Sequence, residues 1–305
     1  MMRFALIGAA GYIAPRHLKA MKEVGGQLVA ALDPFDAVGV LDSFFPEARF
    51  FTHPEVFEAF LEDDPVDWVS VVSPNYLHEA HIRMGLRHGA HVLCEKPLVI
   101  DPASLDRLAE MERRTGKRVF TVLQLRVHPS LLALRERLLG EGGKKEVELT
   151  YITSRGPWYQ ESWKADEKKS GGVATNIGIH FFDLLSWYFG GMEALEVHLR
   201  TPTTVAGYLE LERARVRWFL SIDPSALPQE AKAQGKRTYR SIRIEGEEVE
   251  FSEGFTDLHT EVYRKTLSGE GFGLNEARPG IELAAKVRTA EVSVPSPRAR
   301  HPFLG

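Results

Sequence analysis

The stretch Phe4-Ala5-Leu6-Ile7-Gly8-Ala9-Ala10-Gly11-Tyr12-Ile13-Ala14 decides how the first part of the chain folds. Its apolar run predicts a buried strand, and the small residues that follow predict a tight turn into a helix. The pattern GxGxxG is broken, because Ala10 and Ile13 replace its second and third glycines. The turn instead follows GxxGxxA through Gly8, Gly11 and Ala14, which lets the backbone approach a pyrophosphate at a helix N-terminus. A plain strand-to-helix turn is the alternative.

Outward from this turn, short apolar runs alternate with segments of helical spacing as far as residue 124. Apolar strands separated by helices are typical of a parallel sheet that helices cover on both faces. The sequence therefore predicts an α/β Rossmann domain over residues 1–124, which binds ligands at the carboxyl ends of its strands. Strands are predicted at 4–7, 28–32, 66–72, 91–94 and 119–123, and helices at 15–24, 54–61, 77–88 and 102–115.

After residue 124 consecutive strands follow one another with few helices between them. This pattern predicts an α+β domain with a mostly antiparallel open sheet over residues 125–305. A long helix is predicted from Thr175 to Phe189, and the polar residues 229–237 predict an excursion from the sheet. Further strands are predicted at 146–154, 195–199, 204–211, 215–222, 241–245 and 248–251, and helices at 129–139, 258–267 and 276–290.

Asp33 ends the second predicted strand, where an acid hydrogen-bonds the ribose hydroxyls of a dinucleotide. No Lys or Arg lies between Asp33 and Asp42, so a 2′-phosphate would meet negative charge with nothing to neutralise it. The sequence therefore predicts NAD, and not NADP, as the cofactor. The alternative is a solvent-facing Asp that starts a turn before Pro34.

Composition excludes several classes of protein. Hydrophobic residues make up 44% of the chain and charged residues 26%, values of an ordinary globular protein and not of a disordered one. The net charge of −4 argues against nucleic acid and anionic membranes as partners. A single cysteine, Cys94, excludes an internal disulfide and favours a reducing cytoplasm. The N-terminal apolar run is too short for a signal peptide.

Polar segments follow two of the predicted strands, at the sheet edge where a nicotinamide would lie. They are Ser-Pro-Asn-Tyr-Leu-His at 73–78 and Cys-Glu-Lys-Pro at 94–97. In the second domain, residues 171–183 read Gly-Gly-Val-Ala-Thr-Asn-Ile-Gly-Ile-His-Phe-Phe-Asp. Asn176 and His180 are four residues apart, which would place them on one helical face.

These segments together resemble the Gfo/Idh/MocA oxidoreductase family, whose signatures are a Rossmann turn, an E-K-P segment and a glycine-rich segment before D-x-G-x-H-x-x-D. The resemblance covers essentially the whole chain. It implies an NAD-dependent dehydrogenase of a CH–OH group, with Lys96 and His180 at the reacting carbon. The chain departs from the pattern at Asn176, where many members have Asp, so no acidic partner is expected there.

Hydride leaves a carbinol carbon only if the hydroxyl also loses its proton, so a base must lie beside the nicotinamide. Lys96 suits this role, and His180 would share the proton or hold the hydroxyl in place. The alternatives are a surface lysine in a turn before Pro97 and an ordinary hydrogen-bonded helix histidine. The predicted catalytic residues are Lys96, His180 and Asn176, and the predicted cofactor contacts are Gly8, Gly11, Tyr12, Ile13, Asp33, Ser73, Asn75, His78, Glu95, Lys96 and Gln124.

Six segments are similar to the WlbA/WbpB branch of this family, at 11–17, 73–78, 124–126, 168–172, 178–183 and 271–279. That branch oxidises the sugar C3 hydroxyl of UDP-N-acetylglucosaminuronate to a ketone, on the way to bacterial surface polysaccharide. The resemblance implies the same substrate. It also suggests 2-oxoglutarate as the oxidant that returns NADH to NAD. Some members of the branch use that keto acid and others do not.

Residues 155–164, Arg-Gly-Pro-Trp-Tyr-Gln-Glu-Ser-Trp-Lys, are dense in aromatic and cationic groups. A nucleotide sugar needs a surface to stack on and cations to neutralise its phosphates. We therefore expect Arg155, Tyr159 and Lys164 to bind substrate together with Asn176 and His180, although an ordinary packed loop is an equal alternative. His78, Glu79 and His81 lack the i, i+4 histidine pair of zinc proteases, and no metal is expected.

Two other functions stay open. One is a different sugar or inositol dehydrogenase of the same family, and the other is a non-catalytic regulator that senses NAD or sugar. The presence of both Lys96 and His180 argues against the regulator. We also expect a homo-oligomer, because the open sheet of the second domain commonly pairs with a neighbour in this family.

Overall fold

The structure, a computed structural model, describes residues 1–249 and 257–304 and divides into two compact units. The first unit holds residues 1–128 and 257–278, and the second holds 129–249 and 279–304. This division differs from two contiguous domains with a boundary after residue 124, because residues 257–278 return to the first unit. The helix α13 (Leu274–Thr289) begins in the first unit and continues into the second.

The first unit is built on a six-stranded sheet in the order β3-β2-β1-β4-β5-β6, with all neighbours parallel. The strand order reverses between β1 and β4, which is the Rossmann arrangement and confirms the predicted fold. The strands are β1 (Arg3–Ile7), β2 (Gln27–Leu32), β3 (Arg49–Phe51), β4 (Trp68–Val71), β5 (His91–Cys94) and β6 (Val119–Thr121).

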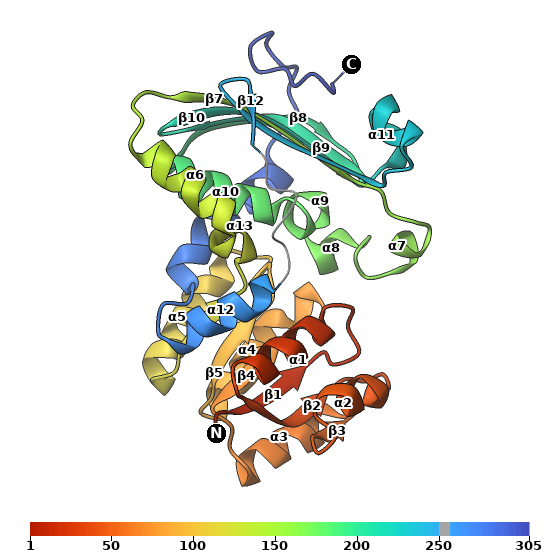
Figure 1. The fold of residues 1–305 in the computed structure, drawn as a ribbon, viewed down its shortest axis with the longest axis vertical. Coiled ribbons are helices and arrows are strands. Elements are labelled where there is room, and N and C mark those ends of the chain that lie inside the picture. The colour runs from red at the N-terminus through yellow and green to blue at the C-terminus, as the bar shows by residue number, and fades with distance from the viewer. Residues whose placement is uncertain (250–256, 305) are drawn as a thin grey trace. The chain divides into compact units, whose positions relative to one another are not determined.

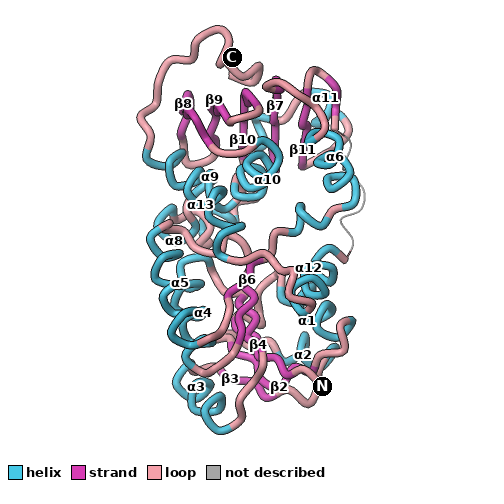
Figure 2. Tube along the Cα trace, turned by 90° about the vertical axis from the view of Figure 1, so that its left-hand side faces the viewer, coloured by secondary structure: helices cyan, strands magenta, loops and turns pink. Residues whose placement is uncertain are grey.

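Helices cover both faces of this sheet, with α3, α4 and α5 on one side of the strands and α1, α2 and α12 on the other (Figure 2). The helices are α1 (Ala14–Glu23), α2 (Val38–Phe44), α3 (Pro54–Asp63), α4 (His78–Arg87), α5 (Ala103–Thr115) and α12 (Leu258–Leu267). Neither α2 nor β3 was predicted from the sequence. The edge strand β3 has three residues, none of them fully buried, and so lacks a readable apolar period.

The helix α12 belongs to the first unit because its apolar face is buried there. Leu258, Val262 and Tyr263 share a core with Phe4 and Met21 and are at most 4% exposed. An amphipathic pattern shows that a helix has a buried face but not which core receives it. The predicted helix at 258–267 is therefore confirmed, while its place in the first unit was not predicted.

The second unit has a six-stranded sheet in the order β12-β11-β7-β10-β9-β8. Only the central pair β7–β10 is parallel, and the other pairs are antiparallel, which confirms the mostly antiparallel sheet. The strands are β7 (Lys145–Thr153), β8 (Met192–Arg200), β9 (Thr204–Leu211), β10 (Ala214–Ser221), β11 (Thr238–Ile244) and β12 (Glu247–Glu248). Of the strand predicted at 248–251, residues 250 and 251 lie outside the described residues.

One face of this sheet carries α6 (Pro129–Leu139), α9 (Gly172–Asn176) and α10 (Ile179–Phe189), and the C-terminal segment lies over the other face (Figure 1). Phe182 of α10 packs edge-on against Trp218 of β10. On the opposite face, His301 stacks on Phe219 and Phe303 stacks on Tyr239. Part of the open face is therefore covered by the chain itself.

The continuous helix predicted from Thr175 to Phe189 is wrong, because α9 ends at Asn176 and α10 begins at Ile179. At this junction the Gly178 N–H bonds to the Val173 carbonyl oxygen at 2.9 Å, one residue further back than an α-helix requires. A Cβ on Gly178 would lie 2.4 Å from the Ala174 carbonyl oxygen. The break therefore removes the regular spacing on which a shared helical face for Asn176 and His180 depended.

Among residues 1–249 and 257–304, no helix combines the length and the apolar character needed to cross a membrane.

Candidate active site

The turn after β1 has the geometry that a dinucleotide requires. Gly8 has a φ of +102°, and a Cβ there would lie 2.6 Å from the backbone nitrogen of Ser73. Glycine is thus needed both for the backbone conformation and for the close approach of the turn to the segment that follows β4. Gly11 closes the turn by donating its N–H to the Gly8 carbonyl at 3.0 Å, and α1 begins three residues later. These residues fit a bound dinucleotide.

Asp33 lies just beyond β2 and holds this turn from the side. Its Oδ2 accepts the Ala10 N–H at 2.9 Å, and its Oδ1 accepts the Phe35 N–H at 2.9 Å. Asp33 as a whole is 6% exposed. The acid therefore shapes the turn, a structural role that the sequence did not reveal, and its hydrogen bond to a ribose stays a prediction.

The other predicted cofactor residues of the turn differ in burial. Tyr12 is 86% exposed, whereas Ile13 packs partly against the core of the first unit.

Two further predicted cofactor residues follow other strands of the sheet. Asn75 is buried at the start of a single 3₁₀ turn (Asn75–Leu77), and Gln124 opens another (Gln124–Val127). The strand ends thus bring Asn75 and Gln124 to the carboxyl edge of the sheet, as predicted, and their contacts with a cofactor stay a prediction.

His78 joins the segments after β4 and β5. Its Nδ1 lies 2.7 Å from the Pro97 carbonyl oxygen, and its Nε2 lies 2.8 Å from the Ser73 carbonyl oxygen. Burial lowers the pKa of His78, against the pull of these two carbonyls and of the Glu95 charge. Each ring nitrogen thus lies beside a carbonyl oxygen of one of the two loops, and the residue bridges these loops.

The neighbouring His81 and Glu79 have other partners. The Ser73 hydroxyl lies 2.8 Å from His81 Nδ1, and burial lowers the pKa of His81 to about 4. Glu79 forms a two-point ion pair with Arg107. His78, Glu79 and His81 therefore each contact different partner groups.

Glu95 and Lys96 follow β5. The Lys96 N–H donates to Glu95 Oε2 at 3.0 Å, and Glu95 Oε1 accepts from His17 at 3.0 Å and from His259 at 2.9 Å. Burial opposes ionisation of Glu95, but the hydrogen bonds from His17 and His259 outweigh it and hold the pKa of that carboxyl well below its ordinary range. Glu95 is thus a buried anion that accepts three hydrogen bonds. Lys96, the next residue, is partly exposed.

In the second unit the predicted substrate residues form a connected group. Asn176, 9% exposed, donates from Nδ2 to the Tyr159 hydroxyl at 3.2 Å. Burial raises the pKa of the Tyr159 phenol, although the Asn176 bond and the Arg155 charge act the other way. His180 is partly exposed in the first turn of α10. Asn176 and Tyr159 are therefore brought together as substrate candidates.

Lys164 lies over two indole rings, with its Nζ 5.3 Å from the ring centre of Trp158 and 5.8 Å from that of Trp163. Burial lowers the pKa of Lys164, and the nearby Arg155 charge acts in the same direction. Trp158 is 51% exposed and offers an aromatic face that the sequence did not single out.

Arg155 also lines a pocket of about 510 Å³ at the ends of β7 and β10. The residues that line this cationic pocket are Ser154, Arg155, Pro224, Ser225, Leu227, Lys232, Gly235, Lys236 and Arg237. Four of them carry positive charge, and no carboxylate is among the described residues that line it. Residues 229–237, expected only as a polar excursion, include α11 (Gln229–Ala233) and supply three of these cations.

The sequence did not predict that His17 and His259 are the partners of Glu95. His17 lies on the apolar face of α1 beside Ala14, Leu18 and Met21, all buried. A histidine at such a spacing signals a buried polar partner, but the partner is set by the fold. His259 is far along the chain and reaches Glu95 only because α12 packs beside α1.

A Rossmann sheet with a GxxGxxA turn, followed by a sheet-and-helix unit with a polar pocket, defines a class of dinucleotide-dependent oxidoreductases. Residues 2–123 match the family described as "Oxidoreductase family, NAD-binding Rossmann fold", and residues 133–272 match its C-terminal alpha/beta domain. The chain belongs to the Gfo/Idh/MocA oxidoreductase family, and its first unit is an NAD-binding Rossmann domain. The resemblance, the enzyme class and the cofactor predicted from the sequence are confirmed.

Two solved structures of the WlbA (WbpB) dehydrogenase from Thermus thermophilus are similar to the whole chain, each covering 100% of both chains with a TM-score of 0.97. One is 68% identical and holds NAD and UDP-GlcNAcA, and the other is 69% identical and holds NAD and alpha-ketoglutarate. The WlbA dehydrogenase from Bordetella pertussis is 21% identical, with a TM-score of 0.79 over 94% of each chain, and shares the fold.

Curated relatives are more distant. Inositol 2-dehydrogenase from Rhizobium meliloti is 29% identical over 193 residues, which cover 62% of this chain and 55% of that protein. The chain matches between 38% and 55% of the length of the first three curated relatives.

Proposed function

We propose that this protein oxidises the C3 hydroxyl of UDP-N-acetylglucosaminuronate to a ketone with NAD, in the biosynthesis of bacterial surface polysaccharide. The observation that carries the proposal is the 68% identity, over the full length of both chains, to a dehydrogenase solved with NAD and UDP-GlcNAcA. The Gly8 turn and Asp33 fit the cofactor, and the cationic pocket fits an anionic substrate.

NAD, when bound, supplies the acceptor for the C3 hydride. In the proposed site Lys96 takes the hydroxyl proton, while His180 and Asn176 hold the sugar hydroxyls. The fixed peptide of Lys96 supports this role, because a base must be held within hydrogen-bond reach of the proton that it removes. Asn176 carries no charge, so it orients the sugar and cannot act as a second base.

The cationic pocket is proposed to bind the diphosphate. Arg155 joins the pocket to Tyr159 and Lys164, whose pKa values respond to its charge, and Tyr159 joins it to Asn176. A nucleotide sugar has the matching sequence of groups, with an aromatic base, two phosphates and a sugar ring. Arginine and lysine side chains are suited to phosphate oxygens, and the exposed ring of Trp158 is suited to a base.

A screen of substrates tests the proposal. NADH formation is followed with UDP-N-acetylglucosaminuronate, UDP-N-acetylglucosamine, glucose and myo-inositol. We expect kcat/KM for the uronate to exceed that for each free sugar by roughly a hundredfold or more, because the free sugars leave the cationic pocket unpaired. Preference for a free sugar would identify the chain as another dehydrogenase of the family. No turnover with any of the four would favour the sensing function.

Reoxidation of NADH by 2-oxoglutarate is proposed as a second half-reaction. The similar Thermus thermophilus dehydrogenase was solved with NAD and alpha-ketoglutarate. A site with cations for a uronate carboxylate, such as Arg155 or Lys164, also suits the carboxylates of the keto acid. Purified protein with bound NADH should lose the NADH absorbance and form 2-hydroxyglutarate when the keto acid is added. Protein that ignores the keto acid and turns over only with free NAD contradicts this step.

We further propose that the enzyme works in the cytoplasm as a homo-oligomer. The outer face of the second sheet carries ion pairs between neighbouring strands, including Arg217–Glu148 and Arg215–Glu146. The C-terminal residues cover one part of this face, so a partner subunit would contact the charged remainder. Light scattering of the purified protein measures the oligomeric state.

A further inference from the structure

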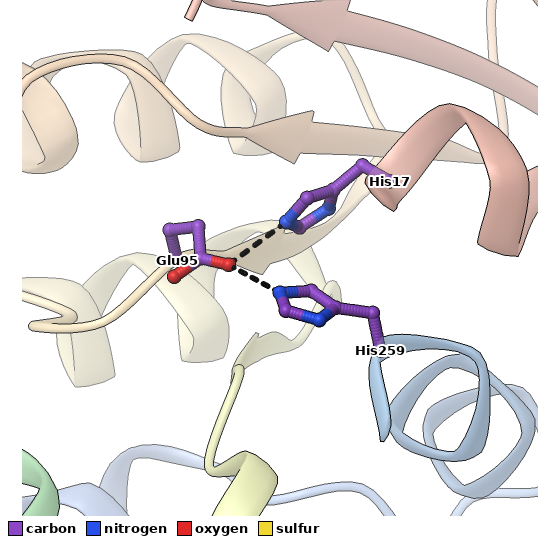
Figure 3. Close-up of side chains that lie close together, drawn as sticks. All are labelled: His17, Glu95 and His259. Carbon is purple, nitrogen blue, oxygen red and sulfur yellow. Dashed lines mark hydrogen bonds and ion pairs between the residues drawn. The ribbon is translucent and has the colours of Figure 1, made fainter. Parts of the chain in front are cut away.

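A chain of buried polar side chains lies behind the peptide that carries Lys96. Glu95, at the end of β5, is reached by His17 from α1 and by His259 from α12 (Figure 3). The three side chains are between 0% and 8% exposed. The Tyr263 hydroxyl lies 2.9 Å from His17 Nδ1 and 2.7 Å from the Ser70 hydroxyl, which extends the chain across the sheet.

The positions of the protons follow from the partners. Burial raises the pKa of Tyr263, which keeps its proton, and burial lowers the pKa of His17, which stays neutral. Ser70 therefore donates to Tyr263, Tyr263 donates to His17 Nδ1, and His17 donates from Nε2 to Glu95. His259 donates from Nε2 to the same carboxylate oxygen. In this arrangement each of these protons has an acceptor, and the anion of Glu95 accepts from His17, His259 and the Lys96 N–H.

A metal ion is the competing explanation, because two imidazole nitrogens and a carboxylate oxygen lie within 4.8 Å of one another. A zinc ion with three protein ligands takes water as a fourth. The three side chains are buried, and both histidine nitrogens lie at hydrogen-bond distance from one carboxylate oxygen. The geometry is that of two N–H donors on a carboxylate.

We propose that His17 and His259 are positioning residues for Lys96. They hold the Glu95 carboxylate ionised and in one orientation, and its second oxygen holds the Lys96 N–H at 3.0 Å. On the other side, His78 Nδ1 lies at hydrogen-bond distance, 2.7 Å, from the Pro97 carbonyl oxygen. The peptide that carries Lys96 is thus fixed at the residues before and after it. This inference rests on the proposed function, in which Lys96 takes the substrate proton.

Variants at His259 test the inference. His259→Leu removes the donor and keeps the volume, whereas His259→Gln places an amide N–H near the position of Nε2. We expect His259→Leu to lower kcat roughly ten- to hundredfold, the effect of a small misplacement of a reacting group, with little change in the dissociation constant of NAD. His259→Gln should recover most of kcat. His53→Leu, at an exposed histidine of the same unit, is the control and should leave kcat unchanged.

Hydrogen exchange gives a readout that does not depend on the substrate. The Lys96 amide should exchange faster in His259→Leu than in wild type, and His259→Gln should restore its protection. If wild type lacks turnover while this pattern holds, the proposed function fails and the positioning role stands. If Leu and Gln variants have equal kcat and equal exchange, the positioning role is wrong.

Two further results complete the test. Should His259→Leu not fold, His259→Asn replaces it, because its amide is too short to reach Glu95 and the same losses are expected. Mass spectrometry of the purified wild type for metals should find no stoichiometric zinc. One zinc per chain that is lost in His259→Gln would overturn the hydrogen-bond assignment.

Discussion

At the scale of single residues, we propose that Asp33 connects the cofactor to the turn that receives it. We expect Asp33→Ala to weaken NAD binding by about 1–3 kcal/mol, the range for a lost charged hydrogen bond. Part of that loss arises because the Ala10 N–H loses its acceptor. Wild type should bind NAD far more tightly than NADP. Titration calorimetry measures both, with Asp42→Ala, at an exposed residue of α2, as the control. Equal affinities of wild type for the two cofactors would contradict the role of Asp33.

Lys96 is the residue on which the proposed chemistry depends. Replacing it by Met should lower kcat by roughly 10²–10⁴, the usual contribution of general acid–base catalysis, while NAD binding stays close to wild type. His180→Asn should also lower kcat, by a smaller factor. Steady-state kinetics and NAD titration measure these effects, and Lys22→Met, at an exposed lysine of α1, is the control. If Lys96→Met turns over like wild type, another group is the base.

At the scale of elements, Glu79 joins α4 to α5. Its carboxylate pairs with Arg107 at 2.8 and 2.9 Å and accepts from Ser104 at 2.6 Å, and chiefly the Arg107 bond lowers the pKa of Glu79 to about 2. A folded-state pKa below the unfolded value stabilises the fold above the unfolded pKa and loses that effect as pH falls through the folded one. The stabilisation should therefore be complete at neutral pH and decline between the ordinary glutamate pKa and about 2.

The variant Glu79→Gln should lower the free energy of unfolding by about 1 kcal/mol at neutral pH, since the pair is partly exposed and screened. The difference from wild type should shrink as pH falls through that window. Urea unfolding at several pH values measures it, and Glu62→Gln, at an exposed residue of α3, is the control. A difference that grows on acidification would show that the ion pair is not its origin.

Elements also show what the sequence can predict. The strands at the centre of the first sheet are largely apolar runs, and across the two sheets β1, β5 and β9 were predicted within one residue of their bounds. The turn at Gly8, the acid at Asp33 and the strand-end position of Lys96 follow from local pattern and could be predicted. The break at Gly178 could not, because it depends on contacts with Phe182 and Leu220 around a site with no room for a Cβ. The His17–Glu95–His259 group could not be predicted either, because it depends on which unit buries the apolar face of α12.

At the scale of the whole molecule, the proposal is that hydride leaves C3 of UDP-N-acetylglucosaminuronate for NAD. The direct measurement uses substrate that carries deuterium at C3 alone, with NAD and catalytic amounts of protein. Mass spectrometry should find the deuterium in the reduced cofactor and a nucleotide sugar with a ketone at C3, and wild type should turn over more slowly on the labelled substrate if hydride transfer limits the rate. Reduced cofactor without deuterium would place the oxidation at another carbon, and absence of reduced cofactor would show that this nucleotide sugar is not the substrate.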